Sequence, residues 1–96
     1  MKYRVHVSSP AADLFNKLPE QVRVDLYPHL VALAEDPYPP NSKALTANLR
    51  GLRSLRVGDY RAVYSVDAKS HLVDIRGVGH RRGFYRLILR LQQEAE

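Results

Sequence analysis

Apolar and polar residues alternate at the start of the chain and then repeat at helical spacing. In residues 2–7 every second side chain is apolar, which is the pattern of a strand with one buried face. In residues 8–18, Ser9 is a good helix N-cap and Pro10 fits the first helical position, so a helix is expected to begin there. Pro19 ends this first helix, which is therefore short.

A second helix is predicted for residues 19–36, because apolar residues recur there every three or four positions. Pro28 lies inside this pattern, removes one backbone hydrogen bond and should bend the helix just before it. We predict one bent helix rather than two separate ones. Residues 36–42 follow as a rigid loop, because their three prolines are incompatible with a helix or a central strand.

The second half of the chain returns to the alternation of strands. Residues 52–57 and 60–66 are predicted to pair as an antiparallel hairpin across a tight turn at Gly58, and residues 71–79 form a third strand. Residues 84–96 are predicted to form a closing helix with one apolar stripe. The expected order is βααβββα, an α+β fold whose antiparallel four-stranded sheet packs against two N-terminal helices and a C-terminal helix.

Length and composition limit what this fold can contain. A chain of 96 residues is one domain, residues 1–96, and its lack of cysteine excludes disulfides, thiolate metal sites and a thiol nucleophile. The histidines and carboxylates are not spaced as metal ligands, so we expect no metal and no cofactor. No apolar stretch is long enough for a signal peptide or a membrane span, which predicts a cytoplasmic protein without membrane contact.

Positive charge is concentrated in the second half of the chain. The whole sequence has a formal net charge of +5, whereas residues 41–90 hold 11 basic and three acidic residues, a net charge of +8. Arginine outnumbers lysine by 11 to four, and its planar guanidinium can bind phosphate through two parallel hydrogen bonds. This distribution favours a polyanionic partner, with charge that only maintains solubility as the alternative.

Two stretches of the sequence resemble the RelE/ParE superfamily of bacterial type II toxins, namely LRGLRSLRVGDYRAVYSVD (residues 49–67) and VGHRRGFY (residues 78–85). The order of elements and the stretch NSKALTANLRG (residues 41–51) fit the same family, so the resemblance covers nearly the whole chain. It implies one of two activities. RelE-type members are ribosome-dependent endoribonucleases that cut mRNA in the A site, whereas ParE-type members bind DNA gyrase and perform no RNA chemistry.

Arg61 and Arg81 match the two arginines that hold the phosphate in nuclease members of the family that this sequence resembles. Their permanently charged guanidiniums suit the stabilisation of charge that builds on a phosphate during cleavage. The alternative for Arg61 is an ion pair with Asp74 or Asp59, and the alternative for Arg81 is a cap on the preceding strand. A cation at the N-terminus of the last helix is electrostatically unfavourable, which favours a functional role for Arg81.

Tyr85 and His80 complete the catalytic residues that the resemblance implies. Tyr85 matches the family's C-terminal tyrosine, which stacks on the substrate nucleotide or donates to it, and packing against the sheet is the alternative. His80 matches a histidine of some nuclease members and is suited to act as a general base near neutral pH. The alternative is a turn histidine whose ring is hydrogen-bonded to the backbone.

The sequence departs from the nuclease pattern that it resembles. Leu52 and Ser54 stand where nuclease members often carry lysines, and residues 37–93 contain no glutamate that could serve as a base. His80 or Lys43 could take over the proton transfer, and arginines of the same region could act electrostatically. We expect the RNA to be bound by the basic residues of this half of the chain, namely Lys43, Arg50, Arg53, Arg56 and Arg82.

The resemblance therefore predicts the toxin of a type II toxin–antitoxin pair that cleaves mRNA in the ribosomal A site. Its expected partners are mRNA, the ribosome with its rRNA, and a cognate antitoxin, since a free toxin would poison its own cell. The antitoxin is expected to land on the apolar stripe of the last helix, if that helix moves: Phe84, Leu87, Ile88 and Leu91. A ParE-like toxin that inhibits gyrase is the alternative, and a relative that only binds RNA or its antitoxin is a third possibility.

Overall fold

Strands and helices follow each other in nearly the order that the sequence pattern predicts. The computed structural model describes residues 2–84, 86 and 88–90, in which Phe84, Arg86 and residues 88–90 are helical. The rest of the predicted closing helix lies outside the described residues. The other elements are, in chain order, β1 (Arg4–Val7), α1 (Ser9–Asn16), α2 (Glu20–Ala32), β2 (Ser42–Ala44), the 3₁₀ helix η1 (Ala47–Leu49), β3 (Arg53–Val57), β4 (Tyr60–Asp67) and β5 (Leu72–His80).

The described strands form one sheet in the order β1-β5-β4-β3-β2. Here β1 is parallel to β5 and the other neighbours are antiparallel. The α+β class is confirmed, whereas the prediction of four strands is wrong by one. The additional strand, β2, has three residues and lies at the sheet edge, where it pairs with β3. A segment this short shows no usable alternation, so only its pairing with β3 defines it as a strand.

The two N-terminal helices begin close to the predicted positions. Ser8, rather than the predicted Ser9, is the N-cap of α1, because its hydroxyl accepts a hydrogen bond of 3.3 Å from the backbone N–H of Ala11. Pro10 then lies in the first turn, where its missing N–H leaves no bond unmade. α2 is a single helix that contains Pro28, as predicted. Among the described residues, no helix has the length and apolar character needed to cross a membrane.

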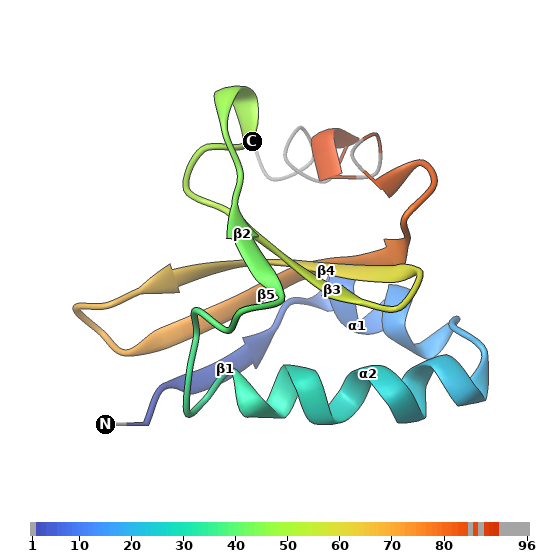
Figure 1. The fold of residues 1–96 in the computed structure, drawn as a ribbon, viewed down its shortest axis with the longest axis horizontal. Helices are drawn as coiled ribbons and strands as arrows, with labels where there is room; N and C mark the ends of the chain where they lie inside the picture. Colours follow the sequence, from blue (N-terminus) through green and yellow to red (C-terminus); the bar gives the residue numbers. More distant parts are fainter. Residues whose placement is uncertain (1, 85, 87, 91–96) are drawn as a thin grey trace.

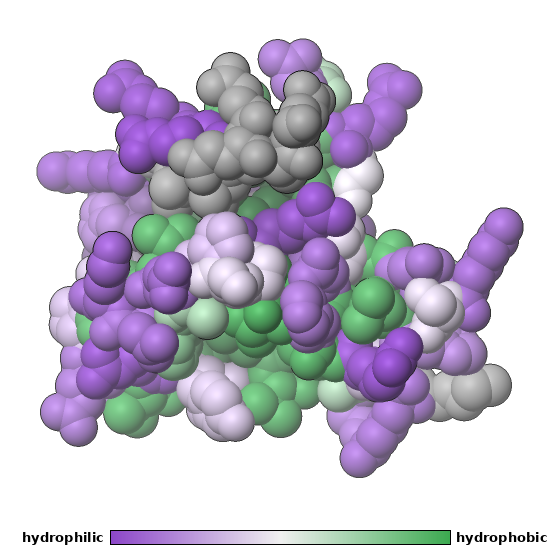
Figure 2. All heavy atoms as spheres, turned by 180° about the vertical axis from the view of Figure 1, so that it is seen from behind, coloured by the Kyte–Doolittle hydropathy of each residue, from purple (hydrophilic) through white to green (hydrophobic). Residues whose placement is uncertain are grey.

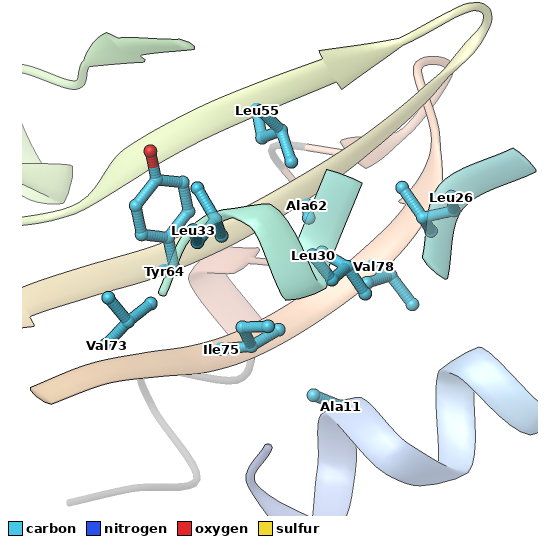
Figure 3. Close-up of a cluster of buried hydrophobic side chains, with 10 residues drawn as sticks. All are labelled: Ala11, Leu26, Leu30, Leu33, Leu55, Ala62, Tyr64, Val73, Ile75 and Val78. Atoms are coloured by element: carbon cyan, nitrogen blue, oxygen red, sulfur yellow. The ribbon is translucent and has the colours of Figure 1, made fainter. Parts of the chain in front are cut away.

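α1 and α2 cover one face of the sheet and bury the main hydrophobic core. Figure 3 shows Leu26 and Leu30 of α2, and Leu33 directly after it, facing side chains of β4 and β5. One of these is Tyr64, which has no exposed surface and donates a hydrogen bond of 2.8 Å from its hydroxyl to the carbonyl oxygen of Pro37. This bond ties the proline loop, and with it the start of β2, to the centre of the sheet.

A second, smaller cluster of buried side chains lies on the opposite face of the sheet, which we call the distal face. It contains Leu45, Leu49, Leu52, Val63, Phe84 and Ile88. Because side chains alternate along a strand, Val63 points to this face while Ala62 and Tyr64 on either side belong to the main core. Figure 1 shows α1 and α2 on one side of the sheet and the helical residues after β5 on the other.

A β-bulge interrupts the pairing of β4 with β5. Tyr64 pairs with Ile75, but the preceding Val63 pairs with Gly77, so Arg76 is the extra residue. One extra residue reverses the face to which every following side chain of that strand points. The last part of β5 is therefore turned over relative to what simple alternation from Ile75 predicts.

Candidate functional site

Two arginines lie side by side in the hairpin of β3 and β4. Arg56 and Arg61 are Cα partners in the antiparallel register, so their side chains share one face of the sheet. Arg56 follows Leu55 and Arg61 precedes Ala62, and both of these neighbours belong to the main core. The two arginines therefore point to the distal face, where Arg56 is exposed and Arg61 is half-buried. We call them the arginine pair.

The arginine pair has no counter-ion among the described residues. Asp74 is one alternative partner of Arg61, but its Oδ2 lies 3.5 Å from Nε of Arg76 instead. Asp59 is the other alternative partner of Arg61, but the described cation within ion-pair distance of its carboxylate is Arg81. Like charges directly opposite each other on a sheet repel, so the arginine pair is a place where a bound anion relieves an unfavourable interaction.

Arg81 joins the arginine pair at the same end of the sheet. Its backbone N–H donates a hydrogen bond of 2.7 Å to the carbonyl oxygen of Asp59, which continues the ladder beyond the pairing of Arg61 with Gly79. The Arg81 side chain is exposed, and its Nε lies 3.9 Å from Oδ1 of Asp59, at the limit of an ion pair. An exposed contact of this length stabilises little and leaves the guanidinium available to a ligand.

His80 does not lie with these arginines. The bulge turns it to the helix side of the sheet, where its ring contacts the Tyr60 ring edge to face at a centroid distance of 5.2 Å. Its Nδ1 accepts a hydrogen bond of 3.1 Å from the backbone N–H of Arg82, whose side chain is exposed. This is the geometry of a turn histidine bonded to the backbone, and it keeps the imidazole away from the distal face.

Arg53 also points to the helix side of the sheet. Its Nη2 donates a hydrogen bond of 2.9 Å to the hydroxyl of Ser42, and its guanidinium carbon lies 5.0 Å from the centre of the Tyr38 ring. These contacts hold the proline loop against β3. The structure does not bring Arg53 to the arginine pair, because residues three apart on a strand, such as Arg53 and Arg56, point to opposite faces.

Lys43 lies on the distal face, one row of residues away from the arginine pair. It is exposed and is the Cα partner of Ser54, which stands two residues before Arg56 on β3. Arg50 is exposed as well, but it follows η1 and lies beyond the other end of β3. Tyr85 lies outside the described residues. The structure therefore groups three of the predicted arginines with one lysine and leaves the other basic residues apart.

Gly77 and Gly79 are parts of the site that the sequence analysis did not identify. The bulge places them opposite Val63 and Arg61, so β5 contributes no side chain to the distal face beside Arg61. A backbone without side chains suits the close approach of a ligand. The sequence RGVG indicates this arrangement, because glycines inside a strand pattern are typical of a bulge or a close approach.

The site combines the guanidiniums of Arg56, Arg61 and Arg81. Such groups bind phosphate oxygens and stabilise developing negative charge, but they do not give up protons at neutral pH. The described part of the chain has no group of three histidines or carboxylates that could hold a metal ion. Figure 2 shows hydrophilic side chains projecting around the margins of the molecule, with hydrophobic patches between them. Fold and site together define a small basic α+β domain suited to bind a polyanion on one sheet face.

Comparison with known proteins places this domain in a family. Residues 7–85 match the family model described as the ParE toxin of the type II toxin–antitoxin system parDE. A curated relative, toxin RelE of Mycobacterium tuberculosis strain H37Rv, is 34% identical over 86 residues, which cover 88% of each chain. The chain belongs to the ParE/RelE family of toxins of type II toxin–antitoxin systems.

Solved structures agree with this assignment. A chain of the RelBE2 toxin–antitoxin complex of M. tuberculosis is similar with a TM-score of 0.77 at 28% identity, over 83% of this chain and 99% of that chain. The isolated RelE toxin of Escherichia coli is similar with a TM-score of 0.69 at 25% identity, over 81% of this chain and 83% of that chain. The resemblance to RelE-type toxins that the sequence indicated is confirmed.

Proposed function

We propose that this toxin is a ribosome-dependent endoribonuclease that cleaves mRNA in the ribosomal A site and thereby stops translation in the cytoplasm. Arg56, Arg61 and Arg81 bind the phosphate at which the chain is cut. Tyr85 contributes by stacking on the adjacent nucleotide or donating to it. No metal is needed, because the nucleophile is supplied by the RNA itself.

The proposed reaction is an internal transesterification. The ribose 2′-oxygen attacks the adjacent phosphorus and releases its proton to solvent, while the bond from phosphorus to the 5′-oxygen breaks and leaves its electron pair on that oxygen. The products are a 2′,3′-cyclic phosphate and, after protonation of the leaving oxygen, a 5′-hydroxyl. Negative charge on the non-bridging oxygens rises in the transition state, and cations positioned beforehand stabilise this charge most effectively.

The arginine pair is the observation that carries this proposal. Two cations are held as direct cross-strand neighbours without a counter-ion in the described residues, and Arg81 adds a third from the end of β5. Their attraction for a phosphodiester grows as its charge increases, so they bind the transition state more tightly than the ground state. A chain that is 34% identical to a curated RelE toxin makes RNA the expected polyanion.

Ribosomes programmed with a defined mRNA provide the test. The wild-type protein should create new RNA ends at the A-site codon, which primer extension would locate. Arg61→Met and Arg81→Ala should each slow cleavage about 10²- to 10³-fold, the usual effect of losing one group that stabilises developing charge. Arg76→Met is the matched control and should cleave at the wild-type rate, because Arg76 sits at the bulge beside Asp74. Folded wild-type protein that leaves the mRNA intact would contradict the proposal.

Inhibition of DNA gyrase is the second candidate function. The matched family model is that of the ParE toxin, and Leu52 and Ser54 are buried residues that transfer no protons at neutral pH. Binding to gyrase needs neither an acid nor a base. In this case Arg61→Met and Arg81→Ala would remain toxic, and the purified protein would inhibit DNA supercoiling by gyrase.

We also propose that a cognate antitoxin binds this toxin at the helical residues after β5. The similar M. tuberculosis structure is a toxin–antitoxin complex. Phe84 and Ile88 are each about 1% exposed and pack in the distal cluster, so they become available only when this segment leaves the sheet. Hydrogen exchange in residues 82–96 should change when antitoxin is added, and unchanged exchange would rule out this landing site. Leu87 and Leu91, predicted for the same site, lie outside the described residues.

A further inference from the structure

The proposed cleavage needs a proton for the leaving 5′-oxygen, and the arginine pair cannot supply one. A guanidinium keeps its proton at any pH near neutrality, and the ring of His80 faces the other side of the sheet. We infer that Lys43 is the general acid that protonates the leaving oxygen. This inference rests on the proposed nuclease function and, of the two residues that the sequence offers for proton transfer, His80 and Lys43, assigns one defined step to Lys43.

Lys43 lies within reach of the arginine pair. Strand pairing sets its Cα about 5 Å from that of Ser54, and Arg56 stands two residues further along β3, about 7 Å away. Arg61 follows as the partner of Arg56 on the next strand. The flexible four-carbon stem of lysine and the stems of two arginines on the same face can converge on one phosphodiester.

Ser54 is the residue of β3 that lies between Lys43 and the arginine pair on the distal face. It is a small residue with 2% exposure, and its hydroxyl has no hydrogen-bond partner among the described residues. Buried hydroxyls are rarely left without a partner, so this oxygen marks a place where another group completes the bond. The Lys43 ammonium has no ion pair among those residues, and when it turns inward over Ser54 it is a suitable donor to that oxygen.

The chemistry of a lysine ammonium suits an acid. The ammonium carries three N–H donors and no acceptor, so it can give a proton but cannot take one. As the bond between phosphorus and the 5′-oxygen breaks, the electron pair on that oxygen accepts a proton from Lys43. The 2′-hydroxyl proton passes to solvent, and Lys43, then a neutral amine, recovers a proton from solvent, so the step balances.

A substrate with a modified leaving group tests this role. Two mRNAs are placed on the ribosome, one with the natural 5′-oxygen at the cut site and one with sulfur in its place. Sulfur leaves as a thiolate without protonation, because thiols are far more acidic than alcohols. Lys43→Ala and Lys43→Arg should both cleave the natural bond about 10²- to 10⁴-fold more slowly than wild type. On the sulfur substrate both variants should remain within about 10-fold of wild type.

Two further variants separate the acid from other roles. Arg61→Met should lose activity on both substrates equally, because its charge acts on the non-bridging oxygens. Lys69→Ala removes the same charge from the exposed turn between β4 and β5 and should cleave both substrates normally. Equal losses of Lys43→Ala on both substrates, with full activity of Lys43→Arg, would reduce Lys43 to a phosphate contact and overturn the inference. Unchanged cleavage by Lys43→Ala would also overturn it, whereas wild-type protein that cuts neither substrate would refute the nuclease function itself.

Discussion

Replacing Arg61 by methionine should raise the thermal stability of this protein at low ionic strength. Methionine keeps a long unbranched stem to pack where half-buried Arg61 packs, but it removes one of two like charges that face each other across β3 and β4. No described residue supplies an opposite charge to Arg61, so its substitution breaks no ion pair. Arg61, which we propose binds the substrate phosphate, therefore lowers the stability of the free protein.

The size of this effect follows from the separation of the two charges. With guanidiniums about 7 Å apart and the dielectric constant of water, which is appropriate to an exposed Arg56, the repulsion is about 0.6 kcal/mol. This lies within the range of about 0.2 to 1 kcal/mol measured for cross-strand pairs. For a domain of this size, about 0.6 kcal/mol corresponds to an increase in Tm of about 2 to 5 °C.

Thermal unfolding at two salt concentrations measures the effect. At about 0.02 M salt the Arg61→Met variant should melt above wild type, and at 1 M salt, where the Debye length is about 3 Å, the difference should disappear. Arg76→Met is the control, since Arg76 lies 3.5 Å from an Asp74 oxygen and its loss should not raise Tm. A lower Tm for Arg61→Met at low salt would refute the reasoning, because it would mean that Arg61 has a stabilising partner.

Three further substitutions test how the fold is held. Tyr64→Phe removes the donor to the buried Pro37 carbonyl and should lower the free energy of unfolding by about 1–3 kcal/mol in urea titrations. Ser8→Ala removes the α1 N-cap and should cost about 1 kcal/mol by the same measurement. Hydrogen bonds from Ser70 hold the pKa of Asp67 below its usual value, so this carboxylate stabilises the fold above about pH 4 and less as the pH falls. Asp67→Asn should therefore flatten the acid side of the stability profile between about pH 5 and 2.

The regular elements could be predicted because each is long enough to show its period. β4 places Ala62 and Tyr64 in the main core and Val63 in the distal cluster, which is the alternation read from the sequence. The pattern did not predict β2, because three residues at a sheet edge show no period. The loop before β2 is held by the hydrogen bond from Tyr64 to Pro37, two residues that are 27 positions apart in the sequence. Such a contact leaves no local trace in the chain.

The site was predicted less completely because its geometry depends on one extra residue. The family resemblance supplied Arg61 and Arg81, and strand pairing places both at one end of the sheet. Simple alternation along β5 would turn His80 to the distal face beside Arg61. The bulge at Arg76 reverses this, so that His80 contacts Tyr60 on the helix side. Neither the charge pattern nor the hydrophobic period reveals to which face of the sheet a residue points after a bulge.

The bulge also determines which residues of β5 lie on each face of the sheet. It lets β5 present Ile75 and then Val78 to the helices, so the main core stays continuous on both sides of the irregularity. On the distal face the same shift leaves only glycine beside Arg61, where a side chain would obstruct a phosphate. The bulge that accommodates Arg76 thus keeps the buried residues of one face and the open backbone of the other in place. A variant lacking Arg76 would still pair Val63 with Gly77 and Arg61 with Gly79, so it should lose only the bulge and keep both main-core packing and phosphate binding.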